Sequence, residues 1–517
     1  MTAHAQSDPL LSVALVVRNA ATTLPETIKS IQPIADQIVV LDTGSTDETP
    51  ETAIGLDAEI VQRPWDDDFA AARNACLSHL RGRWVLWLDA GERVPEDHGR
   101  RLRSMLKEKG AADQAYRMFV WVPQGGGAIS AEQVAQIRLM PNHPSLRFVG
   151  RVREDVLASL TELNIEVESL AERIERTERE HDQQIKLQRA RRNLRLADLQ
   201  IRQHGPSARM FNCVGEALHR LGEAEQAAEM FSQAVAHGRG GSADQLEGFY
   251  GLLTTLDSPP RRELQITTCL KGLETFPLDA QLLCAMGGYL QAQGQLDLAV
   301  RAYQTAFEHG QVNPEVWHLD EIHDITAACC ALALQLQSKD AEALQTLNRA
   351  WERLPASGRI ARHLLQLHAR YGRRDEAMAV VDRMDVPPGQ REAFTAAVRG
   401  ACLAAQRNWI AAKAYLQTAY AAGLDDPFCL RWLSVVLLSL GDAAAAEPVL
   451  QHWERTDPGN AEVQQYLAAL DDAGPSASVA DESARRVRVD APAAGQPPRP
   501  SETVDAPQRD AQITPEP

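Results

Sequence analysis

Short apolar runs alternate with amphipathic segments in the N-terminal part of the chain. The runs are rich in β-branched residues and too short for helices, which favours strands that are buried on both faces. Apolar residues in the intervening segments recur at helical spacing. Strands that alternate with helices predict a parallel α/β sheet. The expected strands cover residues 11–17, 37–41, 58–62 and 84–88, and two of the expected helices cover about residues 23–31 and 69–80.

Beyond residue 100 the alternation of short apolar runs and amphipathic segments is less regular. Two further strands are expected at 116–122 and 136–140, joined by a loop over 123–128 that contains three consecutive glycines. We therefore expect the first domain to cover residues 10–157. Residues 158–205 are dense in charge, which is typical of a solvated helical face. We expect a charged helical connector there.

Residues 206–472 carry a different pattern, in which small and large apolar residues recur at fixed spacing. Ala227, Phe231 and Ala234 illustrate it. The first alanine of this pattern recurs with a period of about 34 residues, which resembles tetratricopeptide repeats. In such arrays small residues let paired helices pack closely, and the stacked pairs form an all-α solenoid. The recurring positions include Ala343, Ala377, Ala412 and Ala446, and glycines at matching upstream positions are Gly215 and Gly287.

Composition narrows the class of protein. The 517-residue chain has a formal net charge of −17, which argues against nucleic-acid binding because phosphate neutralisation needs clustered Lys and Arg. We expect no transmembrane segment, because no apolar run reaches the roughly 18 residues that such a helix needs. The eight cysteines show neither metal-like nor disulfide-like spacing, as expected for reduced thiols in a cytoplasmic protein. Residues 473–517 have few large apolar side chains, and we expect a disordered tail.

Polar residues follow three of the expected strands. Arg18 follows the first strand, Asp42 the second, and Asp89 and Glu92 the fourth. Ligands of open parallel sheets bind beyond the carboxyl ends of the strands, so these side chains are expected to converge on one site. Carboxylates there suit a ribose hydroxyl, a base edge, or a divalent metal that bridges phosphates.

Several of these segments together resemble family 2 glycosyltransferases, which have the Rossmann-like GT-A fold. The resemblance is closest to a bacterial subgroup that includes sublancin-type peptide S-glycosyltransferases and enzymes fused to tetratricopeptide repeats. It implies a nucleotide-sugar donor and a protein or peptide partner bound by the repeats. The segments that carry it are SVALVVRNAATTLPETIKSI, QIVVLDTGSTDETPETA, RPWDDDFAAARNACL, GRWVLWLDAGERV and RFVGRVRED.

The same resemblance implies roles for individual residues. Asp42 is expected to contact the nucleoside, which is expected to be uridine. Arg73 and Asn74 are expected to orient the donor phosphate or sugar. Asp68 has an alternative role as the N-cap of the next helix. The full donor-binding set implied is Val17, Arg18, Asp42, Asp68, Arg73, Asn74 and Asp89.

Catalysis by this family implies a metal and a base. Asp89 corresponds to the first carboxylate of the D-x-D motif that holds Mn²⁺ or Mg²⁺, and Glu92 is the candidate second ligand because Gly91 occupies the usual position. An inverting transfer needs a base near the acceptor. Glu154 and Asp155 are the candidates, with an exposed acidic turn as the alternative interpretation. Arg153 stands where the family has a histidine.

The predicted function is sugar transfer from a nucleotide-diphosphate donor, a UDP-sugar in the first instance, to an acceptor held by the repeats. Negative charge develops on the leaving diphosphate, and a bound cation stabilises it. Gly91 and Arg153 leave two alternatives open. In one, fixed cations partly neutralise the diphosphate without a metal, because guanidinium groups pair well with phosphate oxygens. In the other, the domain has lost catalysis and serves as a ligand-binding or scaffold protein beside a peptide-binding repeat array.

Overall fold

The computed structural model describes residues 9–109, 112–123, 131–176, 183–257, 260–457 and 460–473. The chain forms two compact units, residues 1–333 and 334–517. Most of the expected glycine loop and nearly all of the expected disordered tail lie outside the described residues. No helix in the described ranges is long and apolar enough to cross a bilayer.

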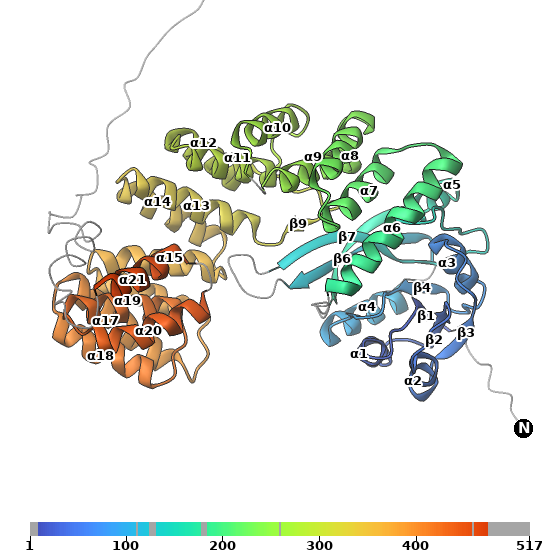
Figure 1. The fold of residues 1–517 in the computed structure, drawn as a ribbon. Helices are drawn as coiled ribbons and strands as arrows, with labels where there is room; N and C mark the ends of the chain where they lie inside the picture. The colour runs from blue at the N-terminus through green and yellow to red at the C-terminus, as the bar shows by residue number, and fades with distance from the viewer. Residues whose placement is uncertain are drawn as a thin grey trace, which may run out of the picture. The chain divides into compact units, whose positions relative to one another are not determined.

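A mixed nine-stranded sheet lies at the centre of the N-terminal domain (Figure 1). Its order is β3-β2-β1-β4-β7-β6-β8-β5, and β9 pairs with β7. The strands β1 to β4 are parallel, which confirms the predicted α/β sheet. These four are β1 (Leu11–Val17), β2 (Gln37–Asp42), β3 (Glu59–Gln62) and β4 (Trp84–Trp87), and the antiparallel pair β6 (Gln114–Pro123) and β7 (Ala131–Pro141) continues the sheet.

Helices cover both faces of this sheet, because alternate residues of its central strand are apolar on both sides. Leu11, Val13 and Leu15 of β1 belong to one buried cluster, and Ala14 belongs to another. The first cluster includes side chains of α1 and α4, and the second includes side chains of α3 and α5. The helices of this domain are α1 (Leu24–Ile31), α2 (Thr49–Gly55), α3 (Phe69–Leu77), α4 (Glu96–Glu108) and α5 (Leu157–Glu162).

The expected helical connector is in part a strand. Strand β8 (Glu166–Arg176) runs parallel to β6 and pairs on its other side with the short strand β5 (Glu92–Arg93). The prediction of helix over 158–205 is therefore wrong for this segment. Its backbone hydrogen bonds go to two neighbouring strands, and pairing of that kind is not encoded in the local charge pattern. Farther along, the same segment contains the predicted charged helix, α6 (Gln183–His204).

A strand from the helical region joins the sheet of the N-terminal domain. Strand β9 (His318–Leu319) pairs antiparallel with β7. The Ala135 N–H donates to the carbonyl of Pro314 at 2.6 Å, and the indole N–H of Trp121 donates to Asp320 at 3.0 Å. The part of β7 that lies beyond its pairing with β4 is therefore paired with β9.

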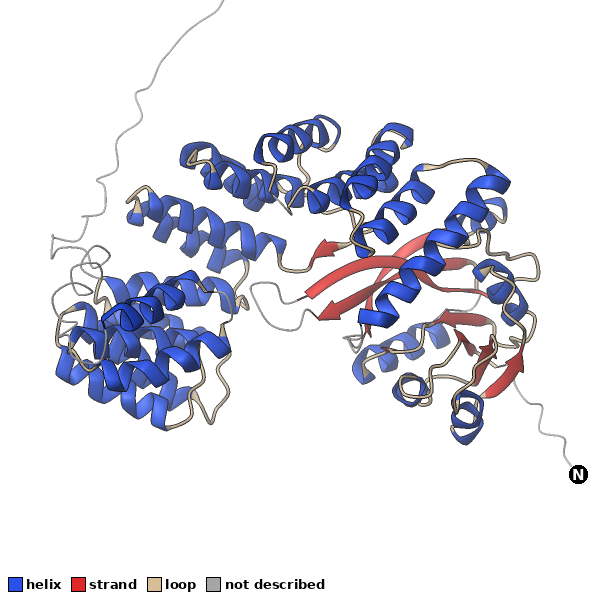
Figure 2. Cartoon of the chain, viewed as in Figure 1, coloured by secondary structure: helices blue, strands red, loops and turns tan. Residues whose placement is uncertain are grey.

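Paired antiparallel helices make up most of the described residues after α6, as the repeat pattern predicts (Figure 2). Helix contacts are close because glycine on one helix faces a large side chain on the next. Gly215 faces the ring of Phe231, and Gly287 faces the ring of Tyr303. In the first unit the helices are α7 (Ala208–Arg220), α8 (Ala224–His237), α9 (Ala243–Thr255), α10 (Arg262–Thr275), α11 (Ala280–Ala292) and α12 (Leu296–His309). From α13 onward they are α13 (Ile322–Leu336), α14 (Asp340–Arg353), α15 (Gly358–Arg370), α16 (Arg374–Arg383), α17 (Arg391–Ala405), α18 (Trp409–Ala421), α19 (Pro427–Ser439), α20 (Ala443–Thr456) and α21 (Ala461–Ala473).

Candidate functional site

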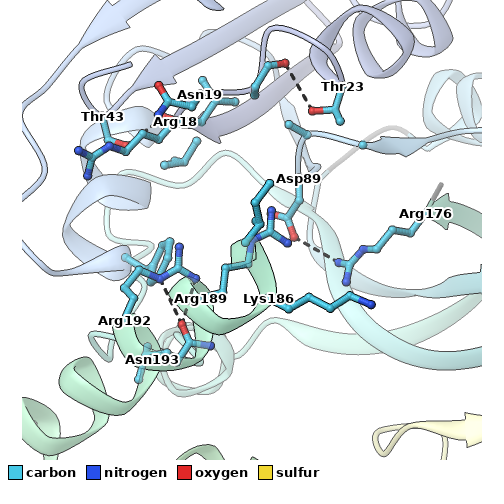
Figure 3. A pocket seen from close by; sticks show the side chains of 18 of the residues that line it. Arg18, Asn19, Thr23, Thr43, Asp89, Arg176, Lys186, Arg189, Arg192 and Asn193 are labelled. Carbon is cyan, nitrogen blue, oxygen red and sulfur yellow. Dashed lines mark hydrogen bonds and ion pairs between the residues drawn. The ribbon is translucent and has the colours of Figure 1, made fainter. Parts of the chain in front are cut away.

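A cavity of about 1030 Å³ opens beyond the carboxyl ends of β1, β2 and β4 (Figure 3). Val17 and Arg18 line it from the end of β1, and Asp89 lines it from the end of β4. Arg73 of α3 and Glu154 complete the predicted residues on its wall. The structure therefore brings these five together where an open α/β sheet binds its ligands.

Asp89 lies among three arginines. Its carboxylate oxygens are 3.4 Å from Arg73 Nη2, 3.4 Å from Arg138 Nη2 and 3.5 Å from Arg176 Nη2. Desolvation raises the pKa of Asp89, but the charges of Arg138, Arg73 and Arg176 outweigh it and hold that pKa well below its usual range. Its side chain remains 41% exposed. Asp89 is therefore an ionised carboxylate that a ligand can reach.

Glu92 is fully buried, and both of its carboxylate oxygens have partners. Oε1 accepts from Arg138 Nη2 at 2.9 Å and from Arg176 Nη2 at 2.6 Å. Oε2 accepts from the backbone N–H of Asp89 at 2.8 Å. These contacts make Glu92 a support for the Asp89 turn and an anchor for two guanidinium groups. They are at odds with the prediction that Glu92 is a metal ligand.

The two candidate bases occupy different surroundings. Glu154 accepts a hydrogen bond from Arg73 Nε at 2.5 Å and is 11% exposed. The Arg73 guanidinium also lies 4.6 Å from the ring of Trp87, so its position is fixed from two sides. Asp155 pairs with Arg209 of α7 at 2.7 Å and accepts from the N–H of Leu157 at 2.7 Å. Glu154 is the one placed against the Asp89 cluster.

Three other predicted donor contacts have local structural partners, and none is among the lining residues of the described cavity. Asp42 is 3% exposed and accepts from the backbone N–H and hydroxyl of Ser45. Asp68 caps α3 by accepting from the N–H of Ala71 at 2.8 Å. Asn74 holds the backbone of Phe148 through two bonds of 2.9 and 2.8 Å. Asn74 thereby fixes the segment that leads to Glu154.

Arg153 joins the N-terminal domain to the first repeat helices. The residue has a φ of 51°, and its guanidinium pairs with Glu216 of α7 at 2.8 Å and with Glu247 of α9 at 2.7 Å. Burial lowers the pKa of Arg153, but the two carboxylates outweigh it and raise that pKa above its usual value. The segment that carries Glu154 is therefore held from the repeat side as well as by Asn74.

Sequence analysis missed the basic face of α6. Lys186, Arg189, Arg192 and Asn193 recur at helical spacing and line the cavity opposite Arg18 (Figure 3). The signal was their spacing of three to four residues, which places side chains on one helix face. The charge pattern alone indicates a solvated helix surface. Only the packing of α6 beside the sheet places this face on the wall of a cavity.

A second cavity of about 620 Å³ adjoins the first. Residues of β6 and β7 line it on one side, and residues of α9 and the segment before β9 line it on the other, including Ser242, Glu247 and Trp317. Six residues border both cavities: Arg73, Asp89, Arg153, Glu154, Arg176 and Glu216. The two cavities therefore meet at the Asp89–Glu154 region.

Comparison with known proteins identifies the N-terminal part of the chain. Residues 12–126 match the model of glycosyl transferase family 2. This segment is a family 2 glycosyltransferase domain. It contains β1 to β4 and Asp89, whereas Glu154, β8 and α6 follow it in the sequence.

Related proteins match parts of this chain. A TPR repeat-containing protein of Synechococcus elongatus is 35% identical over 153 residues, which are 30% of this chain and 37% of that protein. The prophage-derived glycosyltransferase SunS of Bacillus subtilis is 20% identical over 44% of this chain and 53% of its own. The chain thus spans about half or less of these relatives, which support the sublancin-like subgroup.

Solved structures resemble separate parts of the chain. A tetratricopeptide repeat protein from Parabacteroides merdae aligns with 51% of this chain and 98% of its own, at 15% identity and a TM-score of 0.37. A glucosyl-3-phosphoglycerate synthase from Mycobacterium tuberculosis, in complex with Mg²⁺ and UDP, aligns with 22% of this chain and 44% of its own, at 26% identity and a TM-score of 0.20.

The side chains around Asp89 of the glycosyltransferase domain do not fit a divalent cation. Within the described ranges no group of three or more His, Cys, Asp or Glu side chains is placed to hold a metal ion. Mg²⁺ and related hard cations need several oxygen ligands. Glu92 is engaged by Arg138 and Arg176, so among the described residues it does not supply Asp89 with the second carboxylate that the family motif implies.

Proposed function

We propose that the protein transfers a sugar from a nucleoside-diphosphate donor to an acceptor that binds between the glycosyltransferase domain and the first repeats. The observation that carries this proposal is the pair of adjoining cavities with a shared border at Asp89 and Glu154. The first cavity suits the donor, and the second suits the acceptor. The reacting carbon of the sugar then lies where the two meet.

The charges on the two cavity walls support this assignment. Counted over the described residues, the first wall has eight cationic and three anionic side chains, whereas the second has six cationic and seven anionic ones. A diphosphate is attracted to the first wall and gains nothing from the second. Val17 and Arg18 would then flank the nucleoside, with Asp42 beside Val17 on the neighbouring strand β2. UDP is the first nucleotide to test.

Glu154 is the better-placed candidate base. It borders both cavities, whereas Asp155 borders only the second and is tied to Arg209. A base has to lie within hydrogen-bond reach of the acceptor proton. We propose that Glu154 takes this proton and that Arg73 keeps its carboxylate in position.

A peptide or protein acceptor is consistent with walls contributed by the repeats. Ser242, Glu247 and Trp317 line the second cavity from the repeat side.

All eight cysteines lie in the described part of the chain and are free thiols, which supports a reducing compartment such as the cytoplasm.

The test is hydrolysis and transfer with a panel of UDP-sugars. The wild-type chain is expected to release UDP slowly, and Asp89→Asn is expected to lower that rate, because Asp89 holds Arg73, Arg138 and Arg176 in place where the two cavities meet. Glu108→Gln, an acidic surface variant on α4, serves as the matched control. If no nucleotide sugar binds or turns over with Mn²⁺, with Mg²⁺ or with chelator, the proposal fails and the scaffold alternative gains.

A further inference from the structure

We propose that the first cavity binds its nucleoside diphosphate without a divalent cation, because basic side chains from α6, β1 and β8 supply the positive charge. This inference rests on the proposed function and specifies the charge chemistry of the same site. The residues that carry it are Arg18, Arg176, Lys186 and Arg189, all on the wall of the cavity.

The excess of positive charge is local. The chain as a whole has a formal net charge of −17, yet eight of the eleven charged side chains that the described residues place on this wall are cationic. A concave wall of one sign concentrates the field inside it. An anionic ligand is the class that this field selects.

The α6 residues form one continuous surface. Lys186, Arg189 and Asn193 are separated by three and four residues, so they lie on one face of the helix. Lys186 and Arg189 are exposed and line the cavity. In Figure 3 they lie across the cavity from Arg18 and Thr43. A diphosphate between them contacts cations from both sides.

Arg176 contacts both of the carboxylates that the family resemblance assigns to a metal. Its Nη2 is 3.5 Å from Asp89 and 2.6 Å from Glu92, and its side chain is 38% exposed. A guanidinium has five N–H donors in a planar fork, so donors beyond those used by the carboxylates are available for phosphate oxygens. Arginine pairs with phosphate in this bidentate way and stays charged throughout the physiological range.

The carboxylates that would hold a cation are already neutralised. Asp89 faces Arg73, Arg138 and Arg176. A divalent cation at this position would have to displace guanidinium groups that are fixed by Glu92 and Glu154. The charge that develops on the leaving diphosphate is then stabilised by cations that are already in place.

The test is calorimetric titration of the full chain with UDP and with UMP, in Mn²⁺ and in excess EDTA. We expect the Kd for UDP to differ less than about twofold between the two conditions. The double variant Lys186→Gln/Arg189→Gln is expected to weaken UDP about tenfold or more and UMP much less, because the lost charges face the diphosphate. The double variant Arg191→Gln/Arg202→Gln removes equal charge from α6 at residues that do not line this cavity, and is expected to bind as the wild type.

The outcomes separate this inference from the proposed function. Binding of UDP that requires Mn²⁺ overturns the inference and leaves sugar transfer intact. Equal weakening of UDP and UMP in the α6 variant also overturns it, because a diphosphate contact would affect UDP selectively. Absence of UDP binding under both conditions overturns the inference and the donor site together.

Discussion

Glu92 and Arg176 face each other across β5 and β8, in register and joined by a 2.6 Å bond between Oε1 and Nη2. The two residues are far apart in the sequence, and the pair closes the sheet edge beneath Asp89. Glu92 also binds Arg138, whose side chain is only 5% exposed. One carboxylate therefore pairs with two guanidinium groups.

Removing this carboxylate is expected to destabilise the first unit. Glu92→Ala leaves Arg138 buried with a missing partner, and a broken buried ion pair costs about 3–5 kcal/mol. Glu92→Gln keeps the shape and some of the hydrogen bonds, and the expected loss is smaller. Urea unfolding monitored by tryptophan fluorescence measures both. Glu96→Ala, at an exposed pair with Arg100, is the control, and an equal loss in all three variants would contradict the arrangement.

The two candidate bases can be separated by matched amide variants. Glu154→Gln is expected to lower the rate of transfer by about 10²–10⁴-fold, as removal of a general base does, while UDP binding changes little. Asp155→Asn is expected to keep most of the rate. The measurement is the rate of sugar transfer in both variants, with a donor and an acceptor that the wild-type chain uses. Comparable loss in both variants would assign the effect to structure rather than to a base.

Arg153 is expected to hold α7 and α9 against the glycosyltransferase domain. Arg153→Ala leaves Glu216 and Glu247 without this partner, and the expected cost is about 2 kcal/mol because the site is partly exposed. Hydrogen exchange in α7 and α9 should accelerate first. Arg220→Ala removes a more exposed partner of the same Glu216 and should change exchange little. Unchanged protection in Arg153→Ala would rule out this role.

Two adjacent glycines of α11 test the close packing of the repeats. A Cβ on Gly287 would lie 2.6 Å from the ring of Tyr303, whereas a Cβ on Gly288 would meet only the Tyr303 hydroxyl at 3.7 Å. Gly287→Ala should therefore lower stability by about 1–3 kcal/mol through overpacking. Gly288→Ala should raise it by about 0.5–1 kcal/mol through helix propensity. Thermal unfolding of both variants gives the comparison, and the same sign for both would be inconsistent with this packing.

Acid is expected to loosen the β9 pairing. Burial lowers the pKa of His318 from 6.5, although Asp320 opposes this. At a pH just below the ordinary histidine pKa, His318 therefore binds more protons in the detached segment than in the paired one. Pairing is favoured at higher pH, and it weakens as the pH falls below the ordinary histidine pKa. Hydrogen exchange at residues 314–320, corrected for intrinsic rates, should be faster near about pH 5.5 than near about pH 7.5. His318→Gln should remove most of this difference.

The sequence by itself determined the elements whose pattern is local. The apolar runs of β1 to β4 and the periodic alanines of the repeats predict buried strands and paired helices, because burial on one or both faces imposes a fixed spacing. Arg18 and Asp89 were placed at one cavity for a related reason, since parallel strands direct their carboxyl ends to one edge.

Only the tertiary structure decided which charges meet. Glu92 has the carboxylate that a metal ligand needs. However, β8 places Arg176 opposite it, and β7 places Arg138 in contact with it. The charged segment that contains β8 and α6 has the same local appearance throughout, yet its first part pairs with β6 and its second part turns a basic face to the cavity. Long-range pairing and side-chain neutralisation depend on residues distant in the chain, so local periodicity does not encode them.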